Sequence, residues 1–226
     1  GKIMTMKVYF ASGSPWAWRV MLALVHKGLA FDAEEIHFSK GDSQTSEYLA
    51  LNPHGQVPVL QDGDYTLYES GAILAYLDRK YSEKPLFGAT PEDGGLIAQR
   101  MLELEHHLVP IMRAGVRPFF TGDYKDNPEA VQAELAKVPG ELSKIEIWLG
   151  DKDYFFGDAA SALDFTLYPP LALMQRVLGG PAVAVADTSD FLPYSTKFPR
   201  LASWMQRIEA MPRFDEVYPT HWKQAA

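Results

Sequence analysis

The chain has 226 residues, 47% of them hydrophobic, which is enough for one large domain or two smaller ones with buried cores. Its net charge of -8 argues against a nucleic-acid partner, because binding phosphate backbones requires a clustered basic surface. No apolar run reaches the ~20 residues of a membrane span, so we expect a cytoplasmic protein without a membrane partner. The absence of cysteine excludes disulfides and a protein thiol as nucleophile.

The first predicted elements are a short strand at 7–11 and an apolar helix at 16–27, joined by a turn that ends in Ser14-Pro15. Ser14 suits the N-cap position, where a hydroxyl accepts a hydrogen bond from a first-turn amide. Pro15 suits the first helical position, where an amide N–H is not needed. The helix is apolar on nearly every face, so we expect it to be buried against a sheet.

The most informative segment is 52–60, which reads Asn-Pro-His-Gly-Gln-Val-Pro-Val-Leu. Turn residues lead directly into a strand that contains Pro58, and proline cannot donate a ladder hydrogen bond. If the bond between Val57 and Pro58 is cis, the N–H and C=O of Val57 point outward and can pair with an extended, peptide-like ligand. An edge strand that begins with a proline turn is the alternative.

The other elements of the first half complete a recognisable order. A half-buried strand at 31–38, an irregular helix at 43–51, a short strand at 65–68 and an apolar helix at 72–81 are predicted in sequence. The order β-α-β-α-β-β-α is typical of a thioredoxin-like arrangement, in which helices cover a mixed sheet.

The second half of the chain is predicted to be helical. The expected features are helices at 92–116, 128–149 with a kink at Pro139, and 198–211, together with a capping signal at 161–164 and an aromatic tail at 214–222 that packs on the helical domain. We therefore predict an α/β thioredoxin-like domain at 4–81, a linker at 82–91 and an all-α domain at 92–226.

The motif at 52–60, followed by Glu69-Ser70 at a helix start, resembles the N-terminal domain of the cytosolic glutathione transferases. The Ser161–Asp164 capping signal resembles an element of their helical C-terminal domain, so the resemblance covers the whole chain. Ser14-Pro15 before a helix containing Arg19-Val20 is similar to the pattern of the serine-type classes. The resemblance implies glutathione as co-substrate and a homodimer.

The resemblance also implies how glutathione is held. Val57 and Pro58 orient the tripeptide, and Glu69 and Ser70 hold its γ-glutamyl end. Gln56 is the candidate for the glycyl end, where many relatives have a lysine, and Lys40 is a second candidate there. An ordinary capping pair at 69–70 and a solvated lysine at position 40 are the alternatives.

The chemical task is to keep the glutathione sulfur as a thiolate. Lowering a thiol pKa of about 8.5 by about two units requires roughly 2.7 kcal/mol. A hydrogen bond to a charged group contributes roughly 1.5 to 3 kcal/mol and a helix N-terminus roughly 0.3 to 1 kcal/mol. Ser14 offers both, with Ser12 and Tyr9 as rivals and a plain helix cap as the other interpretation of Ser14.

A pocket for the electrophile is predicted to contain Trp16, His107 and Ile111. His106 and His107 are sequence neighbours that face different sides of a helix, so we expect no metal site there.

The predicted function is glutathione transfer to a small hydrophobic electrophile. One alternative is a glutathione-dependent isomerase of the zeta class, although the Ser-Ser-Cys turn typical of that class is missing. The other is a transferase-fold protein that binds ligands without turnover.

Overall fold

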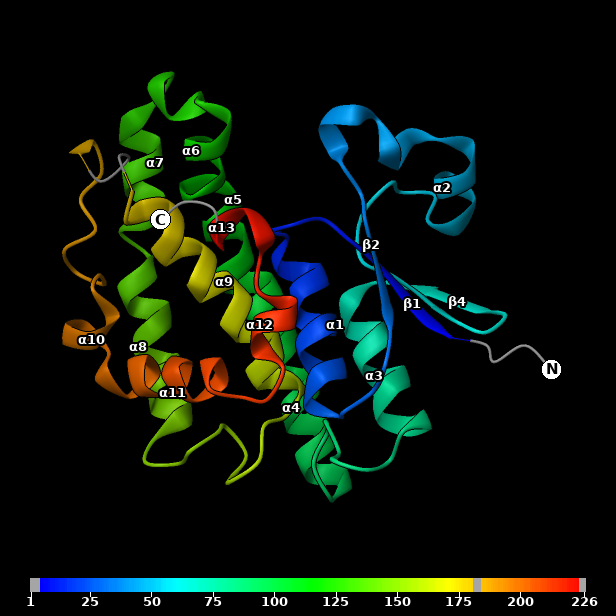
Figure 1. Cartoon of the computed structure of the whole chain (residues 1–226). Helices are drawn as coiled ribbons and strands as arrows, with labels where there is room; N and C mark the ends of the chain where they lie inside the picture. The colour runs from blue at the N-terminus through cyan, green and yellow to red at the C-terminus, as the bar shows by residue number, and fades with distance from the viewer. Residues whose placement is uncertain (1–4, 181–183, 224–226) are drawn as a thin grey trace. The chain divides into compact units, whose positions relative to one another are not determined.

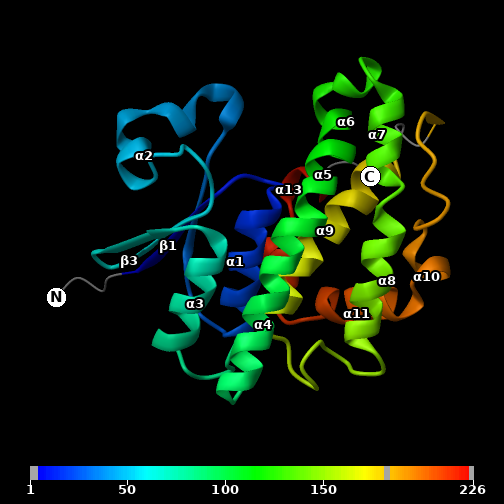
Figure 2. The ribbon, with the colours of Figure 1, turned by 180° about the vertical axis from the view of Figure 1, so that it is seen from behind.

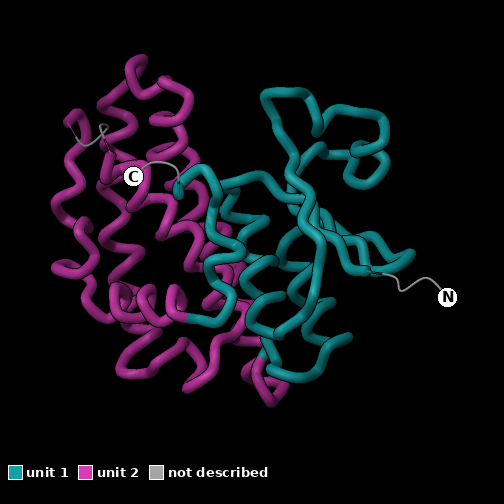
Figure 3. Tube along the Cα trace, in the orientation of Figure 1, with its two compact units in different colours: residues 1–87, 211–226 teal, residues 88–210 magenta. Residues whose placement is uncertain are grey.

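A computed structural model describes residues 5–180 and 184–223 of the chain (Figure 1). The chain divides into two compact units (Figure 3). Residues 1–87 and 211–226 form the first unit, and residues 88–210 form the second. None of the helices in the described ranges combines the length and the apolar character needed to cross a bilayer.

The first unit is built on a four-stranded mixed sheet, as predicted. Its strands are β1 (Met6–Phe10), β2 (Asp32–Glu35), β3 (Val59–Asp62) and β4 (Tyr65–Tyr68), in the order β2-β1-β3-β4. Strands β1 and β2 are parallel, and the other two pairs are antiparallel. Strand β2 is shorter and more exposed than the expected half-buried strand at 31–38, because it lies at the edge of the sheet.

Three helices accompany the sheet: α1 (Pro15–His26), α2 (Ser46–Leu51) and α3 (Ser70–Lys80). Helices α1 and α3 pack against each other and lie side by side in both views, whereas α2 stands apart from them (Figures 1 and 2). Between β2 and α2 lie two short 3₁₀ turns, η1 (Phe38–Lys40) and η2 (Asp42–Gln44). The predicted order β-α-β-α-β-β-α and the thioredoxin-like fold are confirmed.

The second unit is helical, which confirms the predicted fold class. Its elements are α4 (Pro91–Glu103), a π-helical segment η3 (Leu104–Leu108), α5 (Val109–Gly115), α6 (Arg117–Thr121), η4 (Asp123–Lys125), α7 (Pro128–Leu135), α8 (Val138–Leu149), α9 (Ala162–Leu178), α10 (Tyr194–Lys197) and α11 (Pro199–Glu209). Helix α9 is buried along most of its length and contacts α4 and α5, so it forms the centre of this unit.

The prediction of one kinked helix at 128–149 was wrong. Helix α7 ends at Leu135, and α8 begins at Val138 with Pro139 in its first turn. Proline lacks an N–H and clashes with the carbonyl of the preceding turn, so a new helix begins where a kink was expected. The helix predicted at 92–116 forms as α4, η3 and α5 in direct succession.

The aromatic tail forms two short helices, α12 (Phe214–Val217) and α13 (Thr220–Lys223). Its rings surround Trp18 of α1, with centroid distances of 6.2 Å to Phe214, 6.1 Å to Tyr218 and 5.5 Å to Trp222. The prediction that this tail packs on the helical domain is wrong. Contacts with a helix nearly 200 residues earlier place it in the first unit instead.

Candidate functional site

The backbone of Val57 is not used by the sheet. Among the described residues the ladder between β1 and β3 ends at the pair Tyr9–Val59, two residues beyond Val57. The Val57–Pro58 peptide bond is cis, the isomer that the proposed backbone clamp requires. The side chains of Val57 and Pro58 are buried, so the segment is anchored while its polar backbone groups remain outside the ladder.

The loop before Val57 is held by two buried side chains. The Tyr48 hydroxyl and the Asn52 amide both donate to the carbonyl of Gln56, at 2.6 and 3.0 Å. Asn52 also accepts from the His54 amide at 3.0 Å, so one side chain fixes both ends of the loop. Burial raises the pKa of Tyr48 to about 12, which keeps its hydroxyl a donor at neutral pH. The local sequence gives no sign of this role for Tyr48.

Helix α3 begins at a strained residue. Glu69 occupies its N-cap position with φ 73° and ψ 117°, a conformation that residues other than glycine rarely adopt. The side chain of Glu69 makes no capping hydrogen bond and is exposed, whereas Ser70 is only 8% exposed. Such strain persists only where its surroundings enforce it, and it is enriched at functional sites. The geometry leaves the Glu69 carboxylate beside the helix N-terminus, where a ligand carboxylate and ammonium are expected.

The two candidates for the glycyl end of glutathione are both at the surface of the first unit. Lys40 is the last residue of η1, and its side chain is exposed. Gln56 is also exposed, while its carbonyl is held by the loop contacts described above. Their role in binding stays a prediction.

Ser14 occupies the N-cap position of α1, as predicted, but its hydroxyl does not cap the helix. Its amide donates to the carbonyl of Ala11 at 2.9 Å, and its carbonyl accepts from Trp18 at 3.1 Å. The expectation that the Ser14 hydroxyl accepts from a first-turn amide was therefore wrong. The backbone alone positions the half-buried Ser14, and its hydroxyl is not committed to the fold by a cap.

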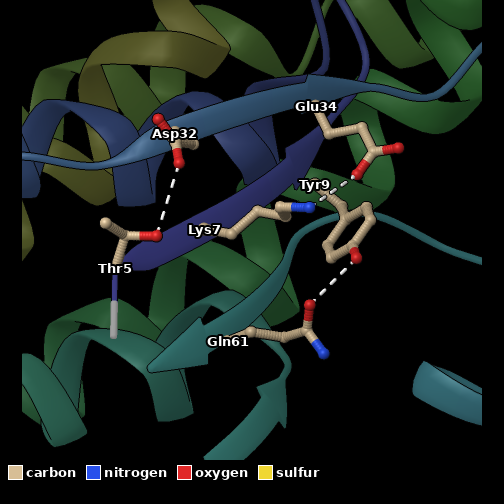
Figure 4. A network of polar contacts seen from close by, with 6 residues as sticks. All are labelled: Thr5, Lys7, Tyr9, Asp32, Glu34 and Gln61. Atoms are coloured by element: carbon tan, nitrogen blue, oxygen red, sulfur yellow. Dashed lines mark hydrogen bonds and ion pairs between the residues drawn. The ribbon is translucent and has the colours of Figure 1, made fainter. Parts of the chain in front are cut away.

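The rival hydroxyl of Tyr9 is already hydrogen-bonded. It donates to Gln61 of the neighbouring strand at 2.9 Å, within a polar network on the sheet (Figure 4). The same network contains the Lys7–Glu34 ion pair at 3.3 Å. Burial, the largest effect, raises the pKa of Tyr9.

The rival hydroxyl of Ser12 is also hydrogen-bonded. It lies 2.6 Å from Nδ1 of His221 in α13 and 3.5 Å from the hydroxyl of Thr220. Nothing in the sequence around Ser12 indicates these contacts, because they join residues more than 200 positions apart.

The three residues predicted to line the electrophile pocket lie in two different units. Trp16 is half-buried in α1 of the first unit. In the second unit, His107 is exposed on η3 and Ile111 of α5 is 5% exposed. Within the described ranges, no three His, Asp or Glu side chains come together as a metal site would require.

A thioredoxin-like unit with a backbone segment at Val57 outside the ladder, followed in the chain by a helical unit, is the arrangement that the resemblance to the cytosolic glutathione transferases predicts. Sequence profiles for this class match the chain in both halves. The profile "Glutathione S-transferase, N-terminal domain" matches residues 4–79, and "Glutathione S-transferase, C-terminal domain" matches residues 107–212.

Similar proteins agree with the profiles. The chain is 32% identical to glutathione S-transferase F9 of Arabidopsis thaliana, covering 95% of this chain and 96% of that protein. It is 30% identical to glutathione S-transferase 2 of Schizosaccharomyces pombe, covering 91% of each. The chain therefore belongs to the glutathione S-transferase family, in agreement with the predicted enzyme class.

Solved structures show the same fold. The structure of a glutathione S-transferase from the Antarctic clam Laternula elliptica has a TM-score of 0.77 and 29% identity, and it covers 97% of this chain and 94% of that chain. The transferase URE2P6 of Phanerochaete chrysosporium, solved in complex with oxidised glutathione, has a TM-score of 0.80 at 24% identity, covering 98% of this chain and 96% of that one.

Proposed function

We propose that this protein is a serine-type glutathione transferase in which Ser14 stabilises the glutathione thiolate. The observation that carries the proposal is the contrast among three hydroxyls near the end of β1. Those of Tyr9 and Ser12 are hydrogen-bonded within the protein, whereas that of Ser14 makes no capping bond at the start of α1. Ser14 is therefore the hydroxyl best suited to donate to a ligand.

Glutathione lies extended in this proposal, with its cysteinyl backbone paired to the N–H and C=O of Val57. Its γ-glutamyl carboxylate accepts from Ser70 at the start of α3, and its ammonium donates to Glu69. Gln56 and Lys40 are available for the glycyl carboxylate. Because the clamp holds the cysteinyl backbone and the α3 terminus holds the γ-glutamyl end, the sulfur is delivered to Ser14 with little freedom.

The reaction needs a deprotonated sulfur. The thiol releases its proton to solvent, and the Ser14 hydroxyl donates a hydrogen bond to the resulting thiolate, aided by the N-terminus of α1. The sulfur then forms a bond with the electrophilic carbon of a small hydrophobic substrate, which loses its leaving group or accepts the electron pair. Trp16, His107 and Ile111 are the residues proposed to contact that substrate.

The family also leads us to propose a cytoplasmic homodimer that acts in detoxification. The test of assembly is the mass of the protein in solution, where twice the chain mass of 25.3 kDa is expected.

The experiment that tests the proposed chemistry combines calorimetry with an ultraviolet titration of the thiolate. Wild type should bind glutathione and hold it as thiolate at neutral pH. Ser14→Ala should bind glutathione with similar affinity but form the thiolate only about one to two pH units higher, since one unit corresponds to 1.36 kcal/mol. Ser14→Thr keeps a hydroxyl and is the matched control.

Three results would count against the proposal. Glutathione bound to wild type entirely as thiol would favour the non-catalytic binding protein. A thiolate unaffected by Ser14→Ala would move the activating role to another group. Isomerisation without net consumption of glutathione would instead favour the zeta-like alternative.

A further inference from the structure

The turn that delivers Ser14 is tight and contains a glycine. The amide of Ser14 donates to the carbonyl of Ala11 at 2.9 Å, so Ser12 and Gly13 are the two central residues. Gly13 has φ +85°, which side chains rarely tolerate. Helix α1 begins at Pro15, immediately after the turn. The position of the Ser14 hydroxyl therefore depends on how firmly two small residues are held.

His221 of α13 contacts both central residues. Its Nδ1 lies 2.6 Å from the Ser12 hydroxyl, a short hydrogen bond. Its ring also lies against Gly13, because a Cβ there would be 2.9 Å from Cε1 and 3.5 Å from Nε2 of His221. A residue from the end of the chain thus closes over the turn that follows the first strand.

Helix α13 is itself anchored next to His221. Trp222 is 8% exposed, and its ring meets that of Trp18 edge to face, at 5.5 Å and 84°. The Lys223 ammonium donates to the carbonyl of Asp215 at 2.7 Å, which ties α13 back to α12. Trp18 belongs to the first turn of α1. The residue that anchors α13 therefore lies close in the chain to the turn that carries Ser14.

We propose that His221 is a positioning residue for thiol activation, acting through Ser12 and Gly13 on the hydroxyl of Ser14. The inference rests on the proposed role of Ser14. A short loop with a central glycine samples several conformations unless it is packed, and a misplacement of about 1 Å at a reacting group can cost about a hundredfold in rate. The contact with His221 restricts the conformations of this turn. It does not involve the clamp at Val57 or the start of α3.

The test measures thiolate formation, glutathione affinity and kcat in three variants. His221→Ala should raise the pH at which bound glutathione ionises by about one unit and lower kcat about tenfold. Its dissociation constant for glutathione should stay within about twofold, because the residues that hold the tripeptide are unchanged. His221→Asn places a polar atom close to the position of Nδ1 and should recover most of the loss. His106→Ala, which removes an exposed histidine of the second unit, is the matched control.

A second substitution separates positioning from packing. Ser12→Ala breaks the same hydrogen bond and leaves the Trp222 anchor in place, so it should reproduce the His221→Ala effect. The double variant should be no worse than either single variant, since both remove one interaction. Melting temperatures within a few degrees of wild type would show that each protein is folded.

Several outcomes would overturn the inference. Folded His221→Ala with a wild-type thiolate titration would do so, as would Asn at 221 being no better than Ala. Additive losses in the double variant would show that Ser12 and His221 act separately. A wild type that forms no thiolate, or a Ser14→Ala variant that ionises glutathione normally, would instead contradict the proposed function.

Discussion

Among the helices that the structure describes, α1 and α9 have a serine at the N-cap position, and the two serines make different contacts. Ser161 starts α9 in the second unit and is 3% exposed. Its hydroxyl accepts from the Leu163 amide at 3.3 Å and donates to Asp164 at 2.9 Å. Ser14 starts α1 in the first unit, is half-buried, and makes no side-chain capping bond.

The polar groups at the start of α9 stabilise the fold, whereas the Ser14 hydroxyl at the start of α1 remains available to a ligand. Asp164 is fully buried and accepts from the amides of Ser161 and Phe155 and from the indole of Trp204. These hydrogen bonds satisfy the buried carboxylate within the protein, as expected for polar groups removed from water. At α1 the backbone fixes the helix start, so the hydroxyl of Ser14 is not needed as a cap and can donate a hydrogen bond to a ligand.

The largest expected effect is at the α9 start. Asp164→Ala leaves buried donors of three residues without their acceptor, at a cost of about 1 to 3 kcal/mol for each unsatisfied group. We expect the free energy of unfolding to fall by about 3 kcal/mol or more in urea titrations. Asp158→Ala, which removes an exposed carboxylate nearby, should change it by less than about 0.5 kcal/mol. An equal effect of both would show that Asp164 is not the centre of this cluster.

Asp62 in the first unit is a carboxylate that accepts several hydrogen bonds from the protein, as Asp164 does in the second unit. It tests whether such groups stabilise both units, or whether the difference in stabilising role holds only between Ser14 and Ser161. Asp62 accepts from Tyr76 at 2.7 Å, and from Lys80 and Tyr81 at 2.9 Å each. Burial raises its pKa, but the three hydrogen bonds outweigh burial and hold the pKa below its ordinary value. Asp62→Asn should therefore lower stability by about 1 to 2 kcal/mol at neutral pH.

The pH dependence of that loss follows from the sign of the shift. With a lowered pKa in the folded state, the unfolded state binds more protons, so the contribution of Asp62 is present above its ordinary pKa of about 4. It is lost as the pH falls through the folded pKa. The gap in melting temperature between wild type and Asp62→Asn should narrow in acid, and Asp64→Asn in the same turn serves as the control. A difference in melting temperature that stays constant with pH would show that the charge of Asp62 does not contribute to stability.

The two serines can be compared directly by truncation. Ser161→Ala removes a real cap and should cost about 1 kcal/mol of stability. Ser14→Ala removes no cap and should change stability by less than about 0.5 kcal/mol, although it lowers catalysis. Chemical unfolding of both variants measures the difference. Equal losses of stability would mean that the Ser14 hydroxyl supports the helix after all.

Glu69 offers a third helix start and the smallest expected effect. Glu69→Gly relieves the strain of a positive φ and should raise stability by up to about 1 kcal/mol, while glutathione binding weakens several-fold. Glu69→Ala removes the same carboxylate but keeps the Cβ, so it should weaken binding without stabilising the fold. If both variants were equally stable, the backbone at Glu69 would not be strained.

Much of the fold followed from local chemistry in the sequence. Three features depend on neighbouring residues and could be predicted from the sequence: the order of the elements, the capping box at Ser161 and the strand that follows Pro58. A disturbance at Pro139 was predicted, but as a kink within one helix and not as the start of a new one. The preceding turn decides whether a helix bends or ends and begins again. Ser14 was correctly placed at the start of α1, but the direction of its hydroxyl was not predictable from a Ser-Pro pair.

The contacts that organise the candidate site depend on residues distant in the chain. His221 meets Ser12 across 209 positions, and the aromatic tail surrounds Trp18 from the far end of the sequence. Periodicity and capping rules describe interactions within a few residues, so they carry no information about which segments meet after folding. The order of the helices and strands and the positions where helices begin depend on neighbouring residues, so the sequence alone determined them. The partners of each hydroxyl arise only when packing brings remote segments together.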